Sequence, residues 1–214
     1  SFDDLLTSVE RALCGPHGAR LSAALRARFR VILVDEFQDT DLTQFSIFSA
    51  IIAGASHPVF FVGDPKQAIY GFRGADVFAY FRAARQPGIA RSTLDRNYRS
   101  DPRLVYAVRH LVERSHAPFV FEEIELPDVR PRDGATDAFA VESRPAPPLR
   151  IRFVARGEHA GKDGVITKET ASKLLPGIVA RDIAALLHGT ATIAGRDIMP
   201  ADIGVLVRTN EQAS

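Results

Sequence analysis

The sequence predicts an α/β fold in which parallel strands are flanked by helices. Two short apolar runs, at residues 31–34 and 58–62, carry this prediction, and each leads directly into acidic residues. A continuous apolar run of this kind is typical of a strand buried on both faces of a parallel sheet. A helix expected between the two runs completes a strand–helix–strand unit, so the acids that follow both strands should meet at one edge of the sheet.

The composition is that of an ordinary soluble protein with one large domain or two small ones. The chain has 214 residues, of which 46% are hydrophobic and 25% charged, with a formal net charge of +1 at pH 7. The overall charge therefore does not point to nucleic acid, although arginine far outnumbers lysine and suits phosphate contacts.

The single cysteine, Cys14, excludes a disulfide framework and a cysteine-based metal site. No apolar run reaches membrane-spanning length and no signal peptide is visible, so a cytoplasmic location without a membrane partner is expected. Because the chain opens on Ser1 without an initiator methionine, we expect it to be a piece of a longer protein.

The first half of the chain predicts four helices. An apolar stripe with acids in its first turn predicts a helix over 2–13, and an Ala/Arg-rich stretch predicts a second over 19–28. Asp41 and Gln44 have capping-box spacing before a helix to about residue 53. A short helix is predicted over 76–84.

A domain boundary is predicted near residues 88–92, which divides the chain into domains 1–90 and 91–214. A brief strand is expected at 92–94. Asp101 is the expected N-cap of a helix that begins at Pro102, because proline is favoured in the first helical turn.

The remaining sequence alternates between loop and regular structure. Recurring prolines and clustered acids predict a long, partly extended connection over 115–148 that is flexible near 130–147. Beyond it we expect a half-exposed strand at 149–154, a helix over 169–187 and a buried strand at 202–207.

Asp35 and Glu36 are the main catalytic candidates. They follow the strand at 31–34, and the carboxyl ends of such strands are where doubly wound α/β proteins bind ligands. We interpret the pair as a Walker B element, in which Asp35 holds Mg²⁺ and Glu36 prepares the water that attacks the γ-phosphate of a nucleotide. The alternative, an acidic turn that caps the next helix, needs only one acid.

Gln67 and an aromatic–glycine stretch follow the second strand. The Gln67 amide lies just beyond the strand edge, where it can hydrogen-bond a γ-phosphate or the attacking water. Tyr70 and Phe72 flank a glycine and offer flat faces on which unpaired bases can stack, and Arg73 adds a phosphate or cation–π contact. The alternative for Tyr70 and Phe72 is a place in the core.

Tyr98 and Arg99 lie in a third polar stretch, Thr93-Leu-Asp-Arg-Asn-Tyr-Arg-Ser100. Tyr98 can stack on a purine, and Arg99 can reach a γ-phosphate as an arginine finger. By itself Asn-Tyr-Arg-Ser is a weak motif that more often caps a helix.

Together the three stretches resemble the superfamily 1 DNA helicases of the UvrD/Rep type, most of all the RecB-like beta subunits of exodeoxyribonuclease V. Val-Asp-Glu-Phe-Gln-Asp-Thr-Asp resembles helicase motif II. Gly-Asp-Pro-Lys-Gln-Ala-Ile-Tyr-Gly-Phe-Arg-Gly-Ala-Asp resembles motif III in its RecB-like form, and Leu-Asp-Arg-Asn-Tyr-Arg-Ser resembles motif IV. The resemblance spans nearly the whole chain, and its first two blocks are highly specific.

The resemblance implies a P-loop NTPase (RecA-like) fold with parallel sheets flanked by helices, present as two partial motor lobes. Residues 1–90 would be the C-terminal part of the first lobe, with motifs II and III. Residues 91–214 would be the N-terminal part of the second lobe, with motif IV. The implied parent is an ATP-dependent helicase that acts on DNA ends in recombinational double-strand-break repair, with ATP and Mg²⁺ as cofactors.

For nucleotide binding, the roles that the resemblance implies are similar to those inferred above from the residues alone. Asp35 would bind Mg²⁺ and Glu36 would be the catalytic base. Gln67 would couple the γ-phosphate to DNA movement, while Tyr98 would pack on adenine and Arg99 would contact the γ-phosphate.

For the macromolecular partners, the resemblance implies single-stranded and double-stranded DNA ends, with RecC- and RecD-like subunits as further candidates. Tyr70 and Phe72 would stack on the bases of single-stranded DNA with support from Arg73.

Gln38, in the motif II block, is a further nucleotide-binding candidate.

One departure from the family pattern limits these expectations. The 214 residues contain no Gly-x-x-x-x-Gly-Lys-[Ser/Thr] phosphate loop, because Gly157-Glu-His-Ala-Gly-Lys-Asp163 is one residue too short and ends in Asp. Without that loop the phosphates lose their cradle, so these residues alone should neither hydrolyse ATP nor unwind DNA. Two alternatives are a non-enzymatic single-stranded-DNA-binding module and a plain phosphate-loop ATPase.

Overall fold

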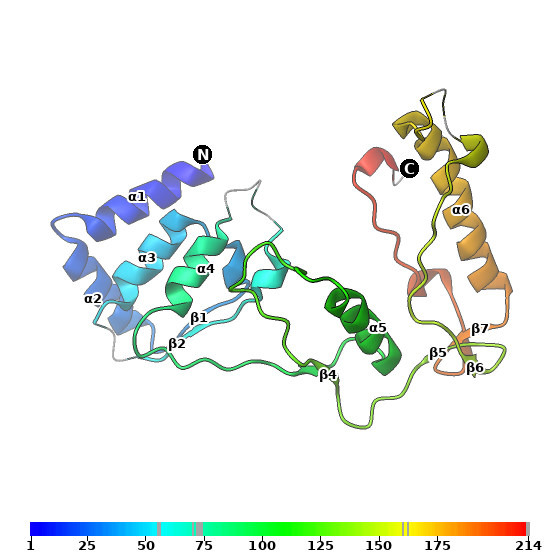
Figure 1. Cartoon of the computed structure of the whole chain (residues 1–214). Helices are drawn as coiled ribbons and strands as arrows, with labels where there is room; N and C mark the ends of the chain where they lie inside the picture. Colours follow the sequence, from blue (N-terminus) through cyan, green and yellow to red (C-terminus); the bar gives the residue numbers. More distant parts are fainter. Residues whose placement is uncertain (55–56, 70, 72–74, 160, 162, 213–214) are drawn as a thin grey trace. The chain divides into compact units, whose positions relative to one another are not determined.

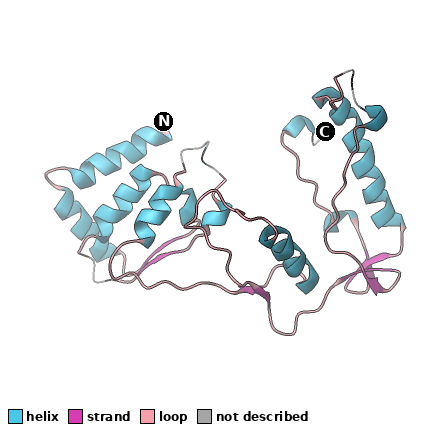
Figure 2. Ribbon diagram, viewed as in Figure 1, coloured by secondary structure: helices cyan, strands magenta, loops and turns pink. Residues whose placement is uncertain are grey.

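The chain folds into two compact units. The computed structural model describes residues 1–54, 57–69, 71, 75–159, 161 and 163–212. The N-terminal unit consists of Ser1–Thr93 and Phe119–Leu126, and the C-terminal unit of Leu94–Pro118 and Pro127–Ser214. Both mix helices with small sheets, so the chain is α/β in class (Figures 1 and 2).

Helices are the main regular elements of the N-terminal unit, and three of them, α1, α2 and α3, pack against one another. As predicted, α3 begins with a capping box, since Asp41 Oδ1 accepts from Gln44 N at 2.8 Å and Gln44 Oε1 accepts from Asp41 N at 3.4 Å. The helices are α1 (Phe2–Cys14), α2 (Gly18–Arg28), α3 (Leu42–Ile52) and α4 (Val77–Ala84).

A parallel pair of strands, β1 (Ile32–Val34) and β2 (Val59–Phe61), forms the sheet of the N-terminal unit (Figure 2). Leu33 pairs with Phe60, and α3 connects the two strands, which confirms the predicted strand–helix–strand unit. The prediction of burial on both faces is wrong, because Leu33 is 63% exposed and Phe60 is 53% exposed. The neighbours of each along the strand are half-buried, so only one face of the sheet is covered.

Phe37 is the centre of an aromatic core beneath the covered face. Its side chain is 1% exposed, and its ring centroid lies 4.3 Å from that of Phe61. Phe45 of α3 and Tyr80 of α4 each lie 6.2 Å from it. Phe37 therefore connects the end of β1 with β2 and with both neighbouring helices.

Residues 119–126 return to the N-terminal unit although they follow α5 (Pro102–Glu113) in the chain. The Phe121 ring packs edge-on against Phe78 at 5.4 Å and Phe81 at 5.7 Å. An ion pair between Arg85 and Glu123 at 2.7 Å adds a second attachment to the end of α4.

The C-terminal unit contains two long helices and two small sheets. Its sheets are a parallel pair, β3 with β4, and a four-stranded antiparallel sheet in the order β6-β5-β7-β8. The elements are β3 (Arg96–Asn97), α5 (Pro102–Glu113), β4 (Arg130–Pro131), β5 (Phe139–Val141), β6 (Arg144–Pro145), α6 (Lys168–His188), β7 (Ala191–Ile193) and β8 (Arg196–Asp197).

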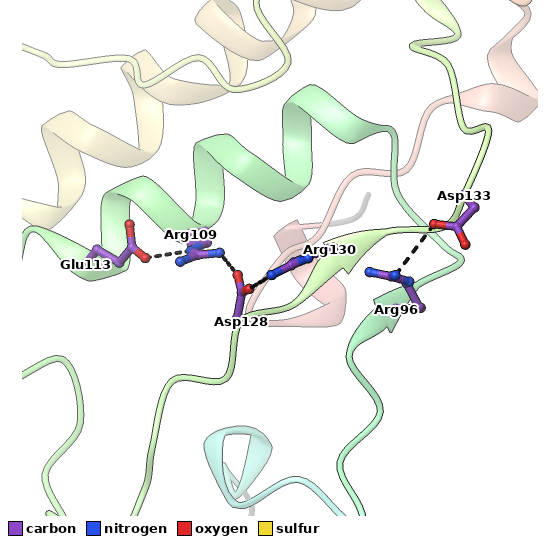
Figure 3. A network of polar contacts seen from close by, with 6 residues as sticks. All are labelled: Arg96, Arg109, Glu113, Asp128, Arg130 and Asp133. Carbon is purple, nitrogen blue, oxygen red and sulfur yellow. Dashed lines mark hydrogen bonds and ion pairs between the residues drawn. The ribbon is translucent and has the colours of Figure 1, made fainter.

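Arginine–carboxylate pairs hold α5 against β4. Arg109 of α5 contacts both Glu113, at 2.6 Å, and Asp128, and Asp128 also accepts from Arg130 Nε at 2.9 Å (Figure 3). Arg96 of β3 pairs with Asp133 at 3.6 Å. The guanidinium groups in this region are thus largely neutralised by carboxylates from the same unit.

Asp101 occupies the N-cap position of α5, as predicted, but its carboxylate does not cap the helix. Its Oδ2 atom instead accepts from the backbone of Ala138 at 2.7 Å. In return Asp137 Oδ1 accepts from Arg103 N in the first turn of α5 at 2.9 Å. The two aspartates join the start of α5 to the start of β5.

Three strand predictions beyond residue 90 are wrong, because the stretches 92–94, 149–154 and 202–207 are not strands among the described residues. The 115–148 connection is partly extended, as predicted, but the paired strands β4, β5 and β6 replace the flexible segment expected near 130–147. Apolar residues of the expected strands stay exposed, with Phe153 at 89% and Leu206 at 101%. A strand needs a partner for its backbone, and no described segment pairs with these stretches.

Of the helices that the structure describes, none combines the length and the apolar character needed to cross a lipid bilayer.

The aromatic core predicts a large stability difference between two phenylalanines. Phe37→Ala should lower the free energy of unfolding by about 3–5 kcal/mol, because it leaves a cavity where β1, β2, α3 and α4 meet. Phe60→Ala, on the exposed face of β2, should cost less than about 1 kcal/mol. Denaturant unfolding followed by circular dichroism measures both, and equal losses would contradict the assigned core.

Candidate functional site

Asp35 and Glu36 lie at the carboxyl end of β1 with their side chains exposed. Glu36 has φ 49° and ψ 40°, a left-handed conformation that residues other than glycine rarely adopt. Asp35 Oδ1 accepts from Glu36 N at 2.9 Å and supports this turn. The sharp turn presents both carboxylates at the sheet edge and sends Phe37 into the core.

Gln38 lies directly beneath these acids and is 1% exposed. Its Nε2 atom donates to Glu36 Oε2 at 2.7 Å, and its Oε1 atom accepts from Asp64 N at 2.9 Å. The amide therefore joins the turn after β1 to the loop after β2. A direct contact between Gln38 and a nucleotide would require these hydrogen bonds to break.

Gly63 permits this close approach between the two edges. A Cβ atom at this position would lie 2.9 Å from Gln38 Oε1 and 3.2 Å from the Phe37 side chain. The first distance is shorter than Cβ contacts in proteins, and the second is tight. A residue larger than glycine would therefore require the Gln38 amide or the loop after β2 to shift.

Asp64 organises the loop that contains Gln67. Its carboxylate accepts from Lys66 Nζ at 2.7 Å and from Gln67 Nε2 at 3.0 Å. Partial burial alone would raise the pKa of Asp64, but the hydrogen bonds from Lys66 and Gln67 together hold it below its ordinary value. Asp64 stays ionised and fixes the direction of Gln67 in this structure.

Asp39 is an acid of the same turn to which the sequence prediction assigned no role. Its Oδ1 atom is shielded from solvent and accepts no hydrogen bond from the described residues. Desolvation, and secondly the negative charge of Glu36, raises the pKa of Asp39. The sequence signal for this residue was its place in Asp-Glu-Phe-Gln-Asp, but its partial burial depends on the turn.

The residues at this edge fit Mg²⁺ by the chemistry of their donors. Mg²⁺ takes oxygen ligands and commonly binds through one or two carboxylates while it keeps several waters. Asp35 offers an exposed carboxylate with one oxygen outside the turn's hydrogen bond. A group of three or more metal-binding side chains is absent from the described ranges, so the donors are few, as Mg²⁺ tolerates.

Tyr98 and Arg99 belong to the C-terminal unit, in the turn between β3 and α5. Asn97 Oδ1 accepts from Arg99 N at 2.9 Å and from Ser100 N at 2.8 Å, so an asparagine side chain shapes the turn. Tyr98 is 77% exposed, and Arg99 is exposed and makes no ion pair within the described ranges. Arg99 thus differs from Arg96, Arg109 and Arg130, whose charges are paired.

The structure brings Asp35, Glu36, Gln38 and Gln67 to one edge of the N-terminal unit. The predicted DNA-binding residues Tyr70, Phe72 and Arg73 lie outside the described residues. Sequence reasoning missed the roles of Gly63, Asp64 and Asn97. The acid after the second strand was visible in the sequence, but its bond to Gln67 was not.

Comparison with known proteins identifies the family of the chain. Residues 1–87 match the UvrD/REP helicase N-terminal domain. Over its whole length the chain is 36% identical to the RecBCD enzyme subunit RecB of Escherichia coli, and over 99% of its length it is 38% identical to that of Mycobacterium tuberculosis. The chain is a RecB-like member of the UvrD/Rep helicase family.

Other bacteria contain similar subunits, for example RecB of Haemophilus influenzae, which is 31% identical over the whole chain. The RecB-like chain covers 18% of the Escherichia coli and Haemophilus influenzae proteins and 19% of the Mycobacterium tuberculosis protein. Residues 1–87, which match this domain, include β1, β2 and every acid of the edge described above.

The depressed pKa of Asp64 predicts a specific acid sensitivity of the RecB-like chain. Its ionised form contributes stability above the unfolded pKa of about 4, and that contribution is lost as pH falls through the lower folded pKa. Asp64→Asn should therefore lower stability near pH 6 and flatten its fall below pH 4. Denaturant unfolding at several pH values tests this, with Asp3→Asn on the exposed face of α1 as the control. Parallel pH profiles for wild type and Asp64→Asn would contradict the assignment.

Proposed function

We propose that these residues are part of an ATP-driven motor that translocates along single-stranded DNA in a RecB-like helicase. The proposed motor has two partial RecA-like lobes of the P-loop NTPase fold, residues 1–90 and 91–214, and works on DNA ends in recombinational double-strand-break repair. One observation carries the proposal. Glu36 and Asp35 are exposed at the end of a parallel strand, and a buried amide holds the Glu36 carboxylate in place.

In this proposal Glu36 is the general base of ATP hydrolysis. Its exposed carboxylate accepts the proton of a water that attacks the γ-phosphate, and the bond to Gln38 restricts its rotation. Asp35 binds Mg²⁺, and the ion, when bound, neutralises charge on the β- and γ-phosphates. Gln67 is exposed beside the same edge and can exchange its bond with Asp64 for one with a γ-phosphate oxygen.

In this proposal Arg99 contacts the γ-phosphate and Tyr98 packs on the adenine of ATP. The Arg99 guanidinium is exposed and unpaired among the described residues, so it can bind a phosphate without first losing a carboxylate partner. The exposed Tyr98 ring offers a face on which adenine can pack. Asn97 fixes the backbone that presents both side chains.

The 214 residues alone should not hydrolyse ATP, because they contain no phosphate loop. We therefore place them within a longer protein, consistent with their span of about a fifth of the RecB relatives. RecC- and RecD-like subunits are the proposed partners of that protein, since the relatives are named as subunits of a RecBCD enzyme. The alternative, a non-enzymatic DNA-binding module, predicts no ATPase activity in any longer form.

The decisive test is Glu36→Gln in the full-length protein. DNA-stimulated ATPase activity should fall about 100-fold or more, because the amide cannot accept the proton from water, while ATP binding persists. Glu10→Gln makes the same chemical change on α1 and should leave turnover unaltered. Undiminished turnover in Glu36→Gln would remove the proposed base, and absent turnover in the wild type would favour the binding module.

The DNA contact is tested separately. Replacing both Tyr70 and Phe72 by alanine in the full-length protein should weaken binding to single-stranded DNA by about 10-fold or more, since base stacking contributes about 1–3 kcal/mol per base. Tyr106→Ala, an exposed tyrosine of α5, is the control. Fluorescence anisotropy with a labelled oligonucleotide measures both, and unchanged affinity in the double variant would exclude the stacking role.

A further inference from the structure

We propose that Gln38 is a positioning residue that connects the catalytic base Glu36 to the loop that contains Gln67. The inference rests on the proposed function, because it assigns Gln38 to the same ATPase site. In this proposal Gln38 does not touch the nucleotide. It hydrogen-bonds both the Glu36 carboxylate and the loop after β2, so the orientation of the carboxylate depends on the position of that loop.

The two ends of the Gln38 amide have different partners that only an amide can serve together. Nε2 donates to a carboxylate oxygen of Glu36 at 2.7 Å, and Oε1 accepts from the Asp64 backbone N–H at 2.9 Å. A carboxylate at this position would lack the donor, and an apolar side chain would lack both groups. At 1% exposure, water cannot readily replace either partner.

The backbone around Gln38 is anchored, so little of a displacement can be absorbed there. Phe37 N donates to Val62 O at 2.9 Å, while the Phe37 side chain is 1% exposed in the core. Gly63 lies so close to Gln38 that a Cβ atom there would be 2.9 Å from Gln38 Oε1, which would then have to shift. A shift of the loop at Asp64 must therefore move the amide, and with it the Glu36 carboxylate.

We call the hydrogen-bonded series Gln67–Asp64–Gln38–Glu36 the relay. Gln67 is its end on the loop that follows β2. Gln67 Nε2 donates to Asp64 Oδ2 at 3.0 Å, and Asp64 N donates to Gln38 Oε1. A phosphate that draws Gln67 away removes one of the bonds that hold Asp64. The relay then has two states, with Gln67 bonded to Asp64 or to phosphate, and the second state changes how Gln38 holds Glu36. Coupling of this kind is reciprocal.

Two substitutions in the full-length protein test the relay. Gln38→Leu removes both bonds and should lower the kcat of the DNA-stimulated ATPase about 10- to 100-fold with the KM for ATP changed less than about twofold, since Glu36 is misplaced but nucleotide contacts remain. A direct nucleotide contact would instead raise KM. Gly63→Ala, which displaces the loop from Gln38, should give the same pattern.

Gln38→Glu should change the pH profile of the ATPase, which a purely structural role of Gln38 would leave unchanged. The introduced carboxyl can donate to Glu36 only when protonated, and burial beside Glu36 and Asp39 raises its pKa. The charged groups on the facing loop are Asp64 and Lys66. The variant should therefore be most active, relative to wild type, at the acidic end of the pH profile and lose activity as pH rises.

The matched control is Gln44→Glu, an equal change in the capping box of α3, where a glutamate still accepts from Asp41 N. Its ATPase pH profile should follow that of the wild type. Hydrogen exchange of the Asp64 amide should accelerate in Gln38→Leu while exchange in α1 stays unchanged, which shows that the variant is folded.

The outcomes separate the relay from the proposed function. If Glu36→Gln abolishes turnover but Gln38→Leu keeps the wild-type kcat, the relay is wrong and the catalytic assignment survives. A raised KM in Gln38→Leu, or a Gln38→Glu profile parallel to that of the wild type, also overturns the relay. If Glu36→Gln retains full turnover, the proposed function itself fails.

Discussion

The backbone hydrogen bond from Phe37 to Val62, at 2.9 Å, is the contact on which the arrangement of the site depends. Val62 N also donates to Val34 O at 2.9 Å, so the two bonds together extend the pairing of β1 and β2 beyond the ends of the strands. Because the chain must reach this point while the Phe37 side chain enters the core, the residues between Val34 and Phe37 make a sharp turn. Glu36 takes the left-handed conformation at that turn, and the two carboxylates are left exposed.

The same constraint explains the electrostatics of the edge. Four carboxylates, from Asp35, Glu36, Asp39 and Asp64, follow the ends of two adjacent strands, and Lys66 is paired with only one of them. Desolvation, and secondly the negative charge of Glu36, disfavours ionisation of Asp39 and raises its pKa. A divalent cation bound at this edge would be stabilised by the same negative field.

The C-terminal unit is held together by a different kind of contact. Polar bonds join α5 to the start of β5, as in the exchange in which Asp101 accepts from Ala138 N and Asp137 accepts from Arg103 N. Arginine–carboxylate pairs link α5 to β4. Arg99 stays outside this network, and Asn97 fixes its backbone, so one exposed cation is held on a defined turn.

Local patterns in the sequence were enough to predict the helices, the order of the parallel strand–helix–strand unit and the acids at its edge, because capping and apolar periodicity act between residues close in the chain. The capping box of Asp41 and Gln44 was readable in this way. Features that depend on partners distant in the chain could be seen only in the folded protein. The stretches 149–154 and 202–207 have strand-like sequences but no described strand beside them, and Leu33 is exposed because only one face of its sheet is covered. The role of Gln38 was equally hidden, since its amide is oriented by Asp64, which lies 26 residues further along the chain.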